Sequence, residues 1–132
     1  MDREALEQLL TAYTAAEQEY LREGTPDKEV PQPSELLEEE ILPPGESIGI
    51  VRQDRFRPVG SHKHNYIELN YVWSGDCSQV VQGKKIVTSQ GEICLMDSEA
   101  EHSVGLCDEQ DILINILIPK RYFNHNFFSR MS

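Results

Sequence analysis

Short runs rich in β-branched and aromatic residues, separated by turn residues, follow one another from residue 48 onwards and constrain the fold more than any other feature. This pattern is typical of an all-β sandwich or barrel. Gly75-Asp76 and Gly83-Lys84 suit hairpin corners, and Gly91 suits a further turn. The predicted strands are 48–57, 66–73, 76–82, 84–89, 92–97, 102–106 and 111–118.

The remaining residues divide into two flanks. Residues 4–22 are predicted to form one helix, because apolar side chains recur at steps of three and four until Gly24 and Pro26 end the pattern. A proline-rich connector follows, with at most one helical turn around Leu36 and Leu37. Pro119 is expected to open a final helical stretch. The predicted divisions are 1–47, an N-terminal helix and proline-rich arm; 48–118, the barrel; and 119–132, the start of C-terminal helices.

Charge and apolar content restrict the function. With 12 basic and 23 acidic residues, the net charge of −11 predicts repulsion from a phosphate backbone. No apolar run approaches the roughly 20 residues of a membrane span, and the acidic N-terminus is unlike a secretory signal. We therefore expect a cytoplasmic protein that contacts no membrane. Three cysteines without a CxxC pair indicate reduced, mostly buried thiols rather than disulfides.

The stretch GSHKHNYIELNYVWSG, residues 60–75, contains the first candidate site. His62 and His64 are two positions apart, so both rings point to one face of an extended strand. Glu68 joins that face if the strand is continuous, whereas a bulge or turn near Asn65 would change the phase. The opposite face is apolar and is predicted to be core, covered by the 4–22 helix, a partner subunit or a second sheet. That face carries Ile67, Leu69, Tyr71 and Trp73.

Two motifs in this region resemble those of the cupin superfamily. The first is His62-x-His64-x3-Glu68-x6-Gly75, and the second is GEICLMDSEAEH, which ends at His102. The second motif departs from the usual cupin pattern at three positions, which are Asp97, Glu99 and Leu106 in place of proline, glycine and asparagine. The resemblance implies a mainly β fold, a cupin-like double-stranded β-helix (a small β-barrel or jelly roll), with an N-terminal helix and a C-terminal helical segment.

A narrower resemblance covers residues 48–128, which look like the N-terminal ligand-sensing domain of AraC-family transcription regulators. In that family the barrel is followed by dimerisation helices and a helix-turn-helix DNA-binding domain. The resemblance implies a homodimer that senses a small molecule, here a carbohydrate, and meets DNA only through a domain missing from this chain. Only 14 residues follow Ile118, and Phe123, Phe127 and Met131 form an uncapped apolar stripe, so we expect the reading frame to continue.

Three functions compete for the polar residues. In the sensor, no metal is required, no residue is catalytic, and the site hydrogen-bonds the hydroxyl groups of the effector. Cupin enzymes instead use four of these positions as metal ligands, and such a set suits zinc, nickel, manganese or iron in an isomerase or dioxygenase. A stand-alone binding barrel is the third. The predicted ligand-binding residues are His62, His64, Tyr66, Glu68, Asn70 and His102. The alternative metal ligands are His62, His64, Glu68 and His102.

Overall fold

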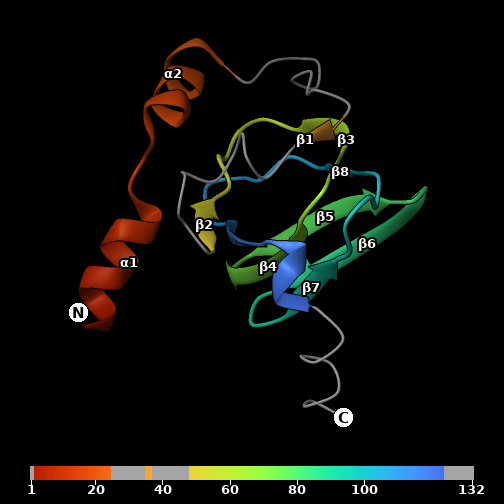
Figure 1. Ribbon diagram of the computed structural model, residues 1–132. Helices are drawn as coiled ribbons and strands as arrows, with labels where there is room; N and C mark the ends of the chain where they lie inside the picture. The colour runs from red at the N-terminus through yellow and green to blue at the C-terminus, as the bar shows by residue number, and fades with distance from the viewer. Residues whose placement is uncertain (1, 25–34, 37–47, 124–132) are drawn as a thin grey trace.

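The computed structural model describes residues 2–24, 35–36 and 48–123, and its strands form two layers (Figure 1). The five-stranded sheet has the order β1-β3-β8-β5-β6 and the four-stranded sheet the order β2-β9-β4-β7. β1 is parallel to β3, and the other pairs are antiparallel. The strands are β1 (Glu35–Leu36), β2 (Gly49–Arg52), β3 (Val59–His64), β4 (Ile67–Ser74), β5 (Asp76–Val81), β6 (Lys84–Ser89), β7 (Ile93–Met96), β8 (His102–Val104) and β9 (Ile112–Ile118).

All seven predicted strands are present, with two departures from the prediction. The first ends at Arg52 instead of residue 57, because the chain turns toward the N-terminal helices there. β3 was not predicted as a separate strand, since VGSHKH has only one β-branched residue. Gly75, Gly83 and Gly91 all have positive φ, which explains why the hairpin corners fall where predicted.

The predicted 4–22 helix is wrong as a single helix. The structure has α1 (Arg3–Thr11) and α2 (Ala15–Glu23) instead. Thr14 accepts a hydrogen bond from the amide of Glu17, and the Glu17 carboxylate accepts one from the amide of Thr14. This reciprocal capping box starts a new helix, although the apolar spacing continues across the break. Gly24 caps α2 with a φ of 93°, as predicted.

Both flanking connections differ in detail from the prediction. Leu36 lies in strand β1, in the connector for which at most one helical turn was predicted, and Leu37 lies outside the described residues. After Pro119 the chain forms the short 3-10 helix η1 (Lys120–Phe123), which agrees with a helical start. The apolar stripe predicted over 123–131 lies outside the described side chains.

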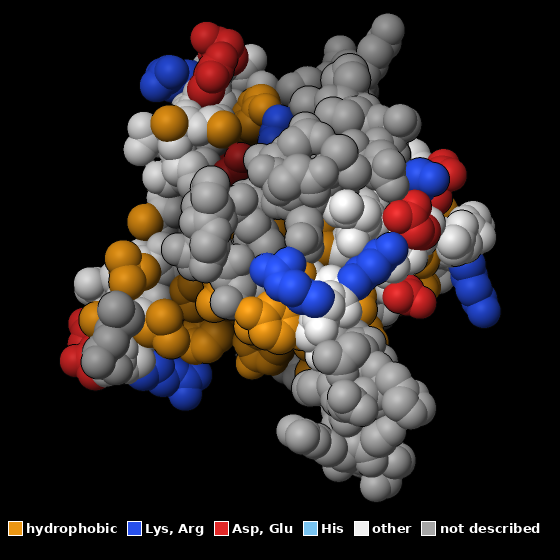
Figure 2. Space-filling model, viewed as in Figure 1, with side chains coloured by type: hydrophobic (Ala, Val, Ile, Leu, Met, Phe, Trp, Pro, Cys, Tyr) orange, Lys and Arg blue, Asp and Glu red, His pale blue; other side chains and the backbone are white. Residues whose placement is uncertain are grey.

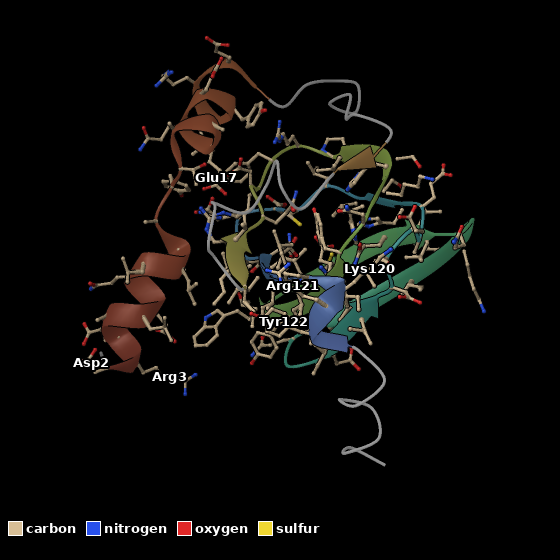
Figure 3. The ribbon with its side chains drawn as sticks, in the orientation of Figure 1. Asp2, Arg3, Glu17, Lys120, Arg121 and Tyr122 are labelled. Atoms are coloured by element: carbon tan, nitrogen blue, oxygen red, sulfur yellow. The ribbon has the colours of Figure 1, made fainter. Side chains whose placement is uncertain are left out.

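A buried carboxylate joins the N-terminal helices to the barrel. Glu17, at the start of α2, has a side-chain exposure of 0% and faces the barrel (Figure 3). Arg52 approaches its carboxylate to 2.7 Å, and Arg55, which is 1% exposed, to 2.8 Å. Arg55 also donates to the carbonyl oxygens of Thr11 and Glu109. The break between the helices therefore places one acid against two barrel arginines.

The apolar residues separate into a core and an outer face. Val72, Cys77 and Leu113 belong to the cluster buried between the sheets, and the three cysteines are free thiols, as expected. The opposite face of β4, predicted to be core, is only partly covered: Ile67 is buried, whereas Leu69, Tyr71 and Trp73 are half-buried. Trp73 lies beside Arg3 of α1, and hydrophobic side chains gather between α1 and η1 (Figure 2). Within the described ranges, each helix is too short or too polar to span a membrane.

Candidate functional site

The chain turns at Asn65 and Tyr66, and this turn builds the site. β3 ends at His64 in the five-stranded sheet, and β4 begins at Ile67 in the four-stranded sheet. The alternative of a turn near Asn65 is therefore correct, and a continuous strand is wrong. His62 and His64 alternate inward from one layer, and Glu68 and Asn70 alternate inward from the other. The two halves of the motif meet across the sandwich.

A cavity of about 350 Å³ lies between the two layers. Five of the six predicted ligand-binding residues line it, and the sixth, His64, is fully buried beside them. The remaining lining is mixed, with valine and leucine side chains beside polar groups that the sequence did not single out. The lining residues are Val51, Gln53, Arg57, Val59, His62, Tyr66, Glu68, Asn70, His102, Val104, Asn115 and Leu117.

Three of the four predicted metal ligands converge closely. One ligand atom from each of His64, Glu68 and His102 lies within 4.8 Å of the others, and all three residues are buried. The Nε2 atoms of His64 and His102 have no hydrogen-bond partner among the described residues. His62 is not in this group, but its ring centre lies 4.5 Å from that of His102 on the paired strand β8.

The tautomers of His62 and His64 follow from their hydrogen bonds. Nδ1 of His62 lies 2.8 Å from the carbonyl oxygen of Gly60, and Nδ1 of His64 lies 2.7 Å from that of Tyr66. Because a carbonyl oxygen only accepts, each Nδ1 carries a proton, and Nε2 is the ring nitrogen left to bind a ligand. Burial, followed by the neighbouring imidazoles, lowers the pKa of His102 to about 3, so the ring of His102 is neutral.

This donor set fits a divalent transition metal. Imidazoles that bind through Nε2, together with one carboxylate, are ligands of zinc, nickel, manganese and iron. Two buried nitrogens without partners are the polar atoms that such an ion would satisfy. His64, Glu68 and His102 would hold the ion, with His62 adjacent. A metal bound there would supply Lewis-acid chemistry at the floor of the cavity.

Amide side chains that sequence reasoning missed surround this floor. Gln79 of β5 donates to Oδ1 of Asn70 over 3.0 Å, and its own Oε1 lies 3.1 Å from Nδ1 of His102. Asn70 donates to Glu68 and to Asn115 of β9. Asn70, Glu68 and His102 were predicted as ligand-binding residues, whereas Gln79 and Asn115 were not. Gln79 could have been found from its position two residues after Cys77, because alternate residues of a strand point to the same face.

Arg57 was also missed, because an arginine in a loop usually lies on the surface. Its guanidinium lies over the ring of Tyr20 in α2 and donates to the Tyr20 hydroxyl over 3.2 Å. Its Nε atom is buried and has no hydrogen-bond partner among the described residues. Its charge is partly balanced by Asp54, whose Oδ2 lies 3.8 Å from the guanidinium, so Arg57 brings to the cavity a positive group with one unsatisfied donor.

The aromatic and loop positions have clear structural roles. Tyr66, proposed from sequence as a sugar-stacking or core residue, is buried and stacks on His64 with ring centres 4.3 Å apart. Glu99, which replaces the usual cupin glycine, nevertheless has a φ of 70°. Its amide donates to the carbonyl oxygen of His64 over 2.8 Å, and Lys63 lies 3.4 Å from its carboxylate. The loop before His102 thus fixes the end of β3.

Comparisons with known proteins agree with this architecture. No curated protein matches the chain. A conserved protein of unknown function from Streptococcus pyogenes shares the fold, with a TM-score of 0.50, 14% identity, and coverage of 64% of this chain and 80% of that one. An RmlC-like cupin from Shewanella frigidimarina has a TM-score of 0.48, 23% identity, and coverage of 57% and 68%. For KdgF from Halomonas sp. the values are 0.47, 20%, 55% and 68%.

The decisive comparison is with a protein family. The family model described as the AraC-like ligand-binding domain matches residues 43–118, which is more than half of the chain. The mainly β, cupin-like jelly roll predicted from the motifs is the fold observed. The chain belongs to the family of AraC-like ligand-binding domains.

Proposed function

We propose that this chain is the effector-sensing domain of an AraC-family transcription regulator. A small carbohydrate binds in the cavity between the sheets, and its binding is signalled to a helix-turn-helix DNA-binding domain outside this chain. The cavity carries the proposal, because about 350 Å³ falls in the range of small-molecule sites and its lining combines apolar walls with a few converging polar groups.

The polar groups favour hydroxyl-rich ligands. Nε2 of His62, Nε2 of His102 and the carboxylate of Glu68 can each act as a hydrogen-bond acceptor. Each can accept a hydrogen bond from a sugar hydroxyl group without leaving a buried donor unpaired. The valine and leucine walls contact the carbon skeleton.

Arg57 narrows the proposed effector class further. A guanidinium group with an unsatisfied Nε binds a carboxylate better than it binds a neutral hydroxyl group. The cavity therefore favours a sugar acid over the corresponding neutral sugar. Tyr20 contacts the same guanidinium, so an acidic effector would compete with a contact from α2.

Thermal denaturation with a panel of neutral sugars, uronic acids and aldonic acids tests this proposal. A ligand present at 100 times its Kd stabilises the folded protein by about 2.7 kcal/mol. Glu68→Ala and His102→Ala should abolish the shift, and Lys85→Ala, at an exposed position on β6, should preserve it. The sensor proposal would be wrong if the panel gave no shift, and the site would be misplaced if both cavity variants responded like wild type.

A metal-dependent cupin enzyme is the second candidate, and the convergence of His64, Glu68 and His102 favours it. Elemental analysis of protein purified without added metal distinguishes it from a metal-free sensor. One equivalent of a transition metal that is retained through dialysis would favour the enzyme. Absence of bound metal in the folded, effector-responsive protein would favour the sensor.

The proposal extends to location and assembly. We place the protein in the cytoplasm as a homodimer, with DNA bound only by the additional domain. With a net charge of −11, this chain alone should give no shift in a DNA mobility assay. Sedimentation equilibrium tests the dimer, and a monomer at all concentrations would contradict it. Effector binding without any linked DNA-binding domain would instead indicate a stand-alone binding barrel.

A further inference from the structure

A buried chain of side-chain hydrogen bonds links the carboxylate at the cavity floor to one of its imidazoles. Nδ2 of Asn70 lies 3.1 Å from Oε2 of Glu68. Oδ1 of Asn70 accepts from Nε2 of Gln79, and Oε1 of Gln79 lies 3.1 Å from Nδ1 of His102. All four residues are buried, which strengthens these hydrogen bonds relative to the same bonds in water.

The chemistry of the groups fixes which atom donates and which accepts at each hydrogen bond of this network. A carboxylate only accepts hydrogen bonds, so Asn70 turns its amide NH₂ toward Glu68 and its oxygen toward Gln79. Gln79 must then donate its NH₂ to Asn70, which leaves its oxygen for His102. His102 can satisfy that oxygen only with a proton on Nδ1, and its Nε2 is consequently a lone pair.

A branch of the same network reinforces the orientation of Asn70. Its NH₂ group also donates to Oδ1 of Asn115 over 2.8 Å, and Asn115 donates onward to Gln53. Both acceptors of Asn70 lie in the four-stranded sheet, whereas Gln79 and His102 lie in the other. The hydrogen-bond network therefore links the orientation of Asn70 in the four-stranded sheet to the orientations of Gln79 and His102 in the five-stranded sheet.

We propose that Gln79 is a positioning residue that, linked through Asn70 to the carboxyl group of Glu68, sets the tautomer of His102. The backbone carbonyls of Gly60 and Tyr66 hold Nδ1 of the other two histidines in the same donor role. Nε2 of each histidine is then the atom left to face the carboxylate and a ligand. The floor of the cavity takes a divalent cation or hydrogen-donating groups and rejects ether and carbonyl oxygens. This inference goes beyond the proposed function, because it holds for a sensor and for an enzyme alike.

Long-range ¹⁵N–¹H NMR of the metal-free, histidine-labelled protein tests the tautomer directly. The signals of His102 are identified by their loss in His102→Gln. Wild type should show a protonated Nδ1 and a bare Nε2 at His102. Gln79→Leu keeps much of the volume but removes both hydrogen bonds, so the two nitrogen shifts should move toward each other as the tautomers mix. Thr88→Val is the matched control, since it removes a buried polar group of the neighbouring strand β6 that does not line the cavity, and it should leave His102 unchanged.

Ni²⁺ titration by calorimetry provides a second readout. Loss of a residue that orients a metal ligand typically weakens metal affinity by about 10- to 100-fold, and we expect this for Gln79→Leu but not for Thr88→Val. The tautomer readout needs no metal, so it decides the question even if wild type does not bind Ni²⁺.

The inference is overturned if His102 of wild type is protonated on Nε2, or if Gln79→Leu leaves both nitrogen shifts unchanged. Should Gln79→Leu fail to fold, Gln79→Glu replaces it. Its carboxylate can still accept from Nδ1 of His102, so the wild-type tautomer should persist although the bond to Asn70 is lost. A bare Nδ1 in Gln79→Glu would also contradict the proposed role.

Discussion

Replacing Glu17 with glutamine should destabilise the fold strongly while barely changing its shape. Glutamine retains the length of the side chain and one oxygen acceptor, but it removes the charge that faces Arg52 and Arg55. Both arginine contacts are short, at 2.7 and 2.8 Å, and the carboxylate is inaccessible to solvent. The variant therefore leaves two guanidinium groups without their counter-ion, one of them fully buried.

Breaking a buried ion pair by removing one partner costs about 3–5 kcal/mol. A chain of this size loses about 4 °C of Tm per kcal/mol, so Tm should fall by about 12–20 °C. Glu7→Gln is the matched control, because Glu7 pairs with Arg3 at 3.4 Å where the side chains are 49% and 84% exposed. Its cost should stay below about 0.5 kcal/mol.

The pH dependence of stability gives an independent check. Burial alone would raise the pKa of Glu17, but hydrogen bonds from Arg52 and Arg55 lower it well below its ordinary value of 4.5. As the pH falls, the unfolded chain takes up this proton before the folded one. The stabilisation by Glu17 is therefore complete above about pH 4.5 and is lost progressively below it.

Urea unfolding at several pH values measures both effects. Glu17→Gln should lower the free energy of unfolding at neutral pH and reduce its decline below pH 4.5. A loss under about 1 kcal/mol at pH 7, with an acid limb identical to that of wild type, would refute the reasoning. It would show that the two arginines are adequately solvated without Glu17.

Three further predictions concern the glycine turns, metal dependence and the helix break. Gly75→Ala should cost about 1–3 kcal/mol more than Gly83→Ala in urea unfolding, since both have positive φ but only at Gly75 would Cβ lie 2.8 Å from the Asp111 backbone. Equal losses would mean that the Asp111 loop moves aside. A chelator should leave the thermal transition of the protein in place, because the apolar core between the sheets is independent of any ion; collapse of the transition would indicate a structural metal. Thr14→Ala should cost about 1 kcal/mol through loss of the α2 cap, and helicity by circular dichroism identical to wild type, with unchanged stability, would contradict this.

The strands could be predicted because local chemistry and tertiary structure agree. The turn glycines Gly75, Gly83 and Gly91 adopt the left-handed conformation that their turns require. Alternate residues of β4 and β9 are buried between the two sheets. β3 escaped prediction because Val59 is its only β-branched residue, and two of its other buried residues are histidines, which carry no β signal. The helix break escaped because Thr14 and Glu17 form their capping box inside an uninterrupted apolar spacing.

The candidate site was predictable only in part. Spacing within the motifs brought out His62, His64, Glu68 and His102, and the fold places them together. Their binding role stays a prediction. Gln79 and Arg57 could not be identified, because their importance depends on partners distant in sequence. Gln79 meets His102 from 23 positions away, and Arg57 meets Tyr20 from 37 positions away.

The turn at Asn65 has a mechanical consequence for the site. Since the imidazoles come from one layer and the carboxylate from the other, the thickness of the sandwich is itself a dimension of the binding site. Core residues such as Val72 and Leu113, which are absent from the cavity lining, act as spacers that set this thickness. Trimming either spacer should change which ligands fit, so selectivity can be tuned from positions that never touch a ligand.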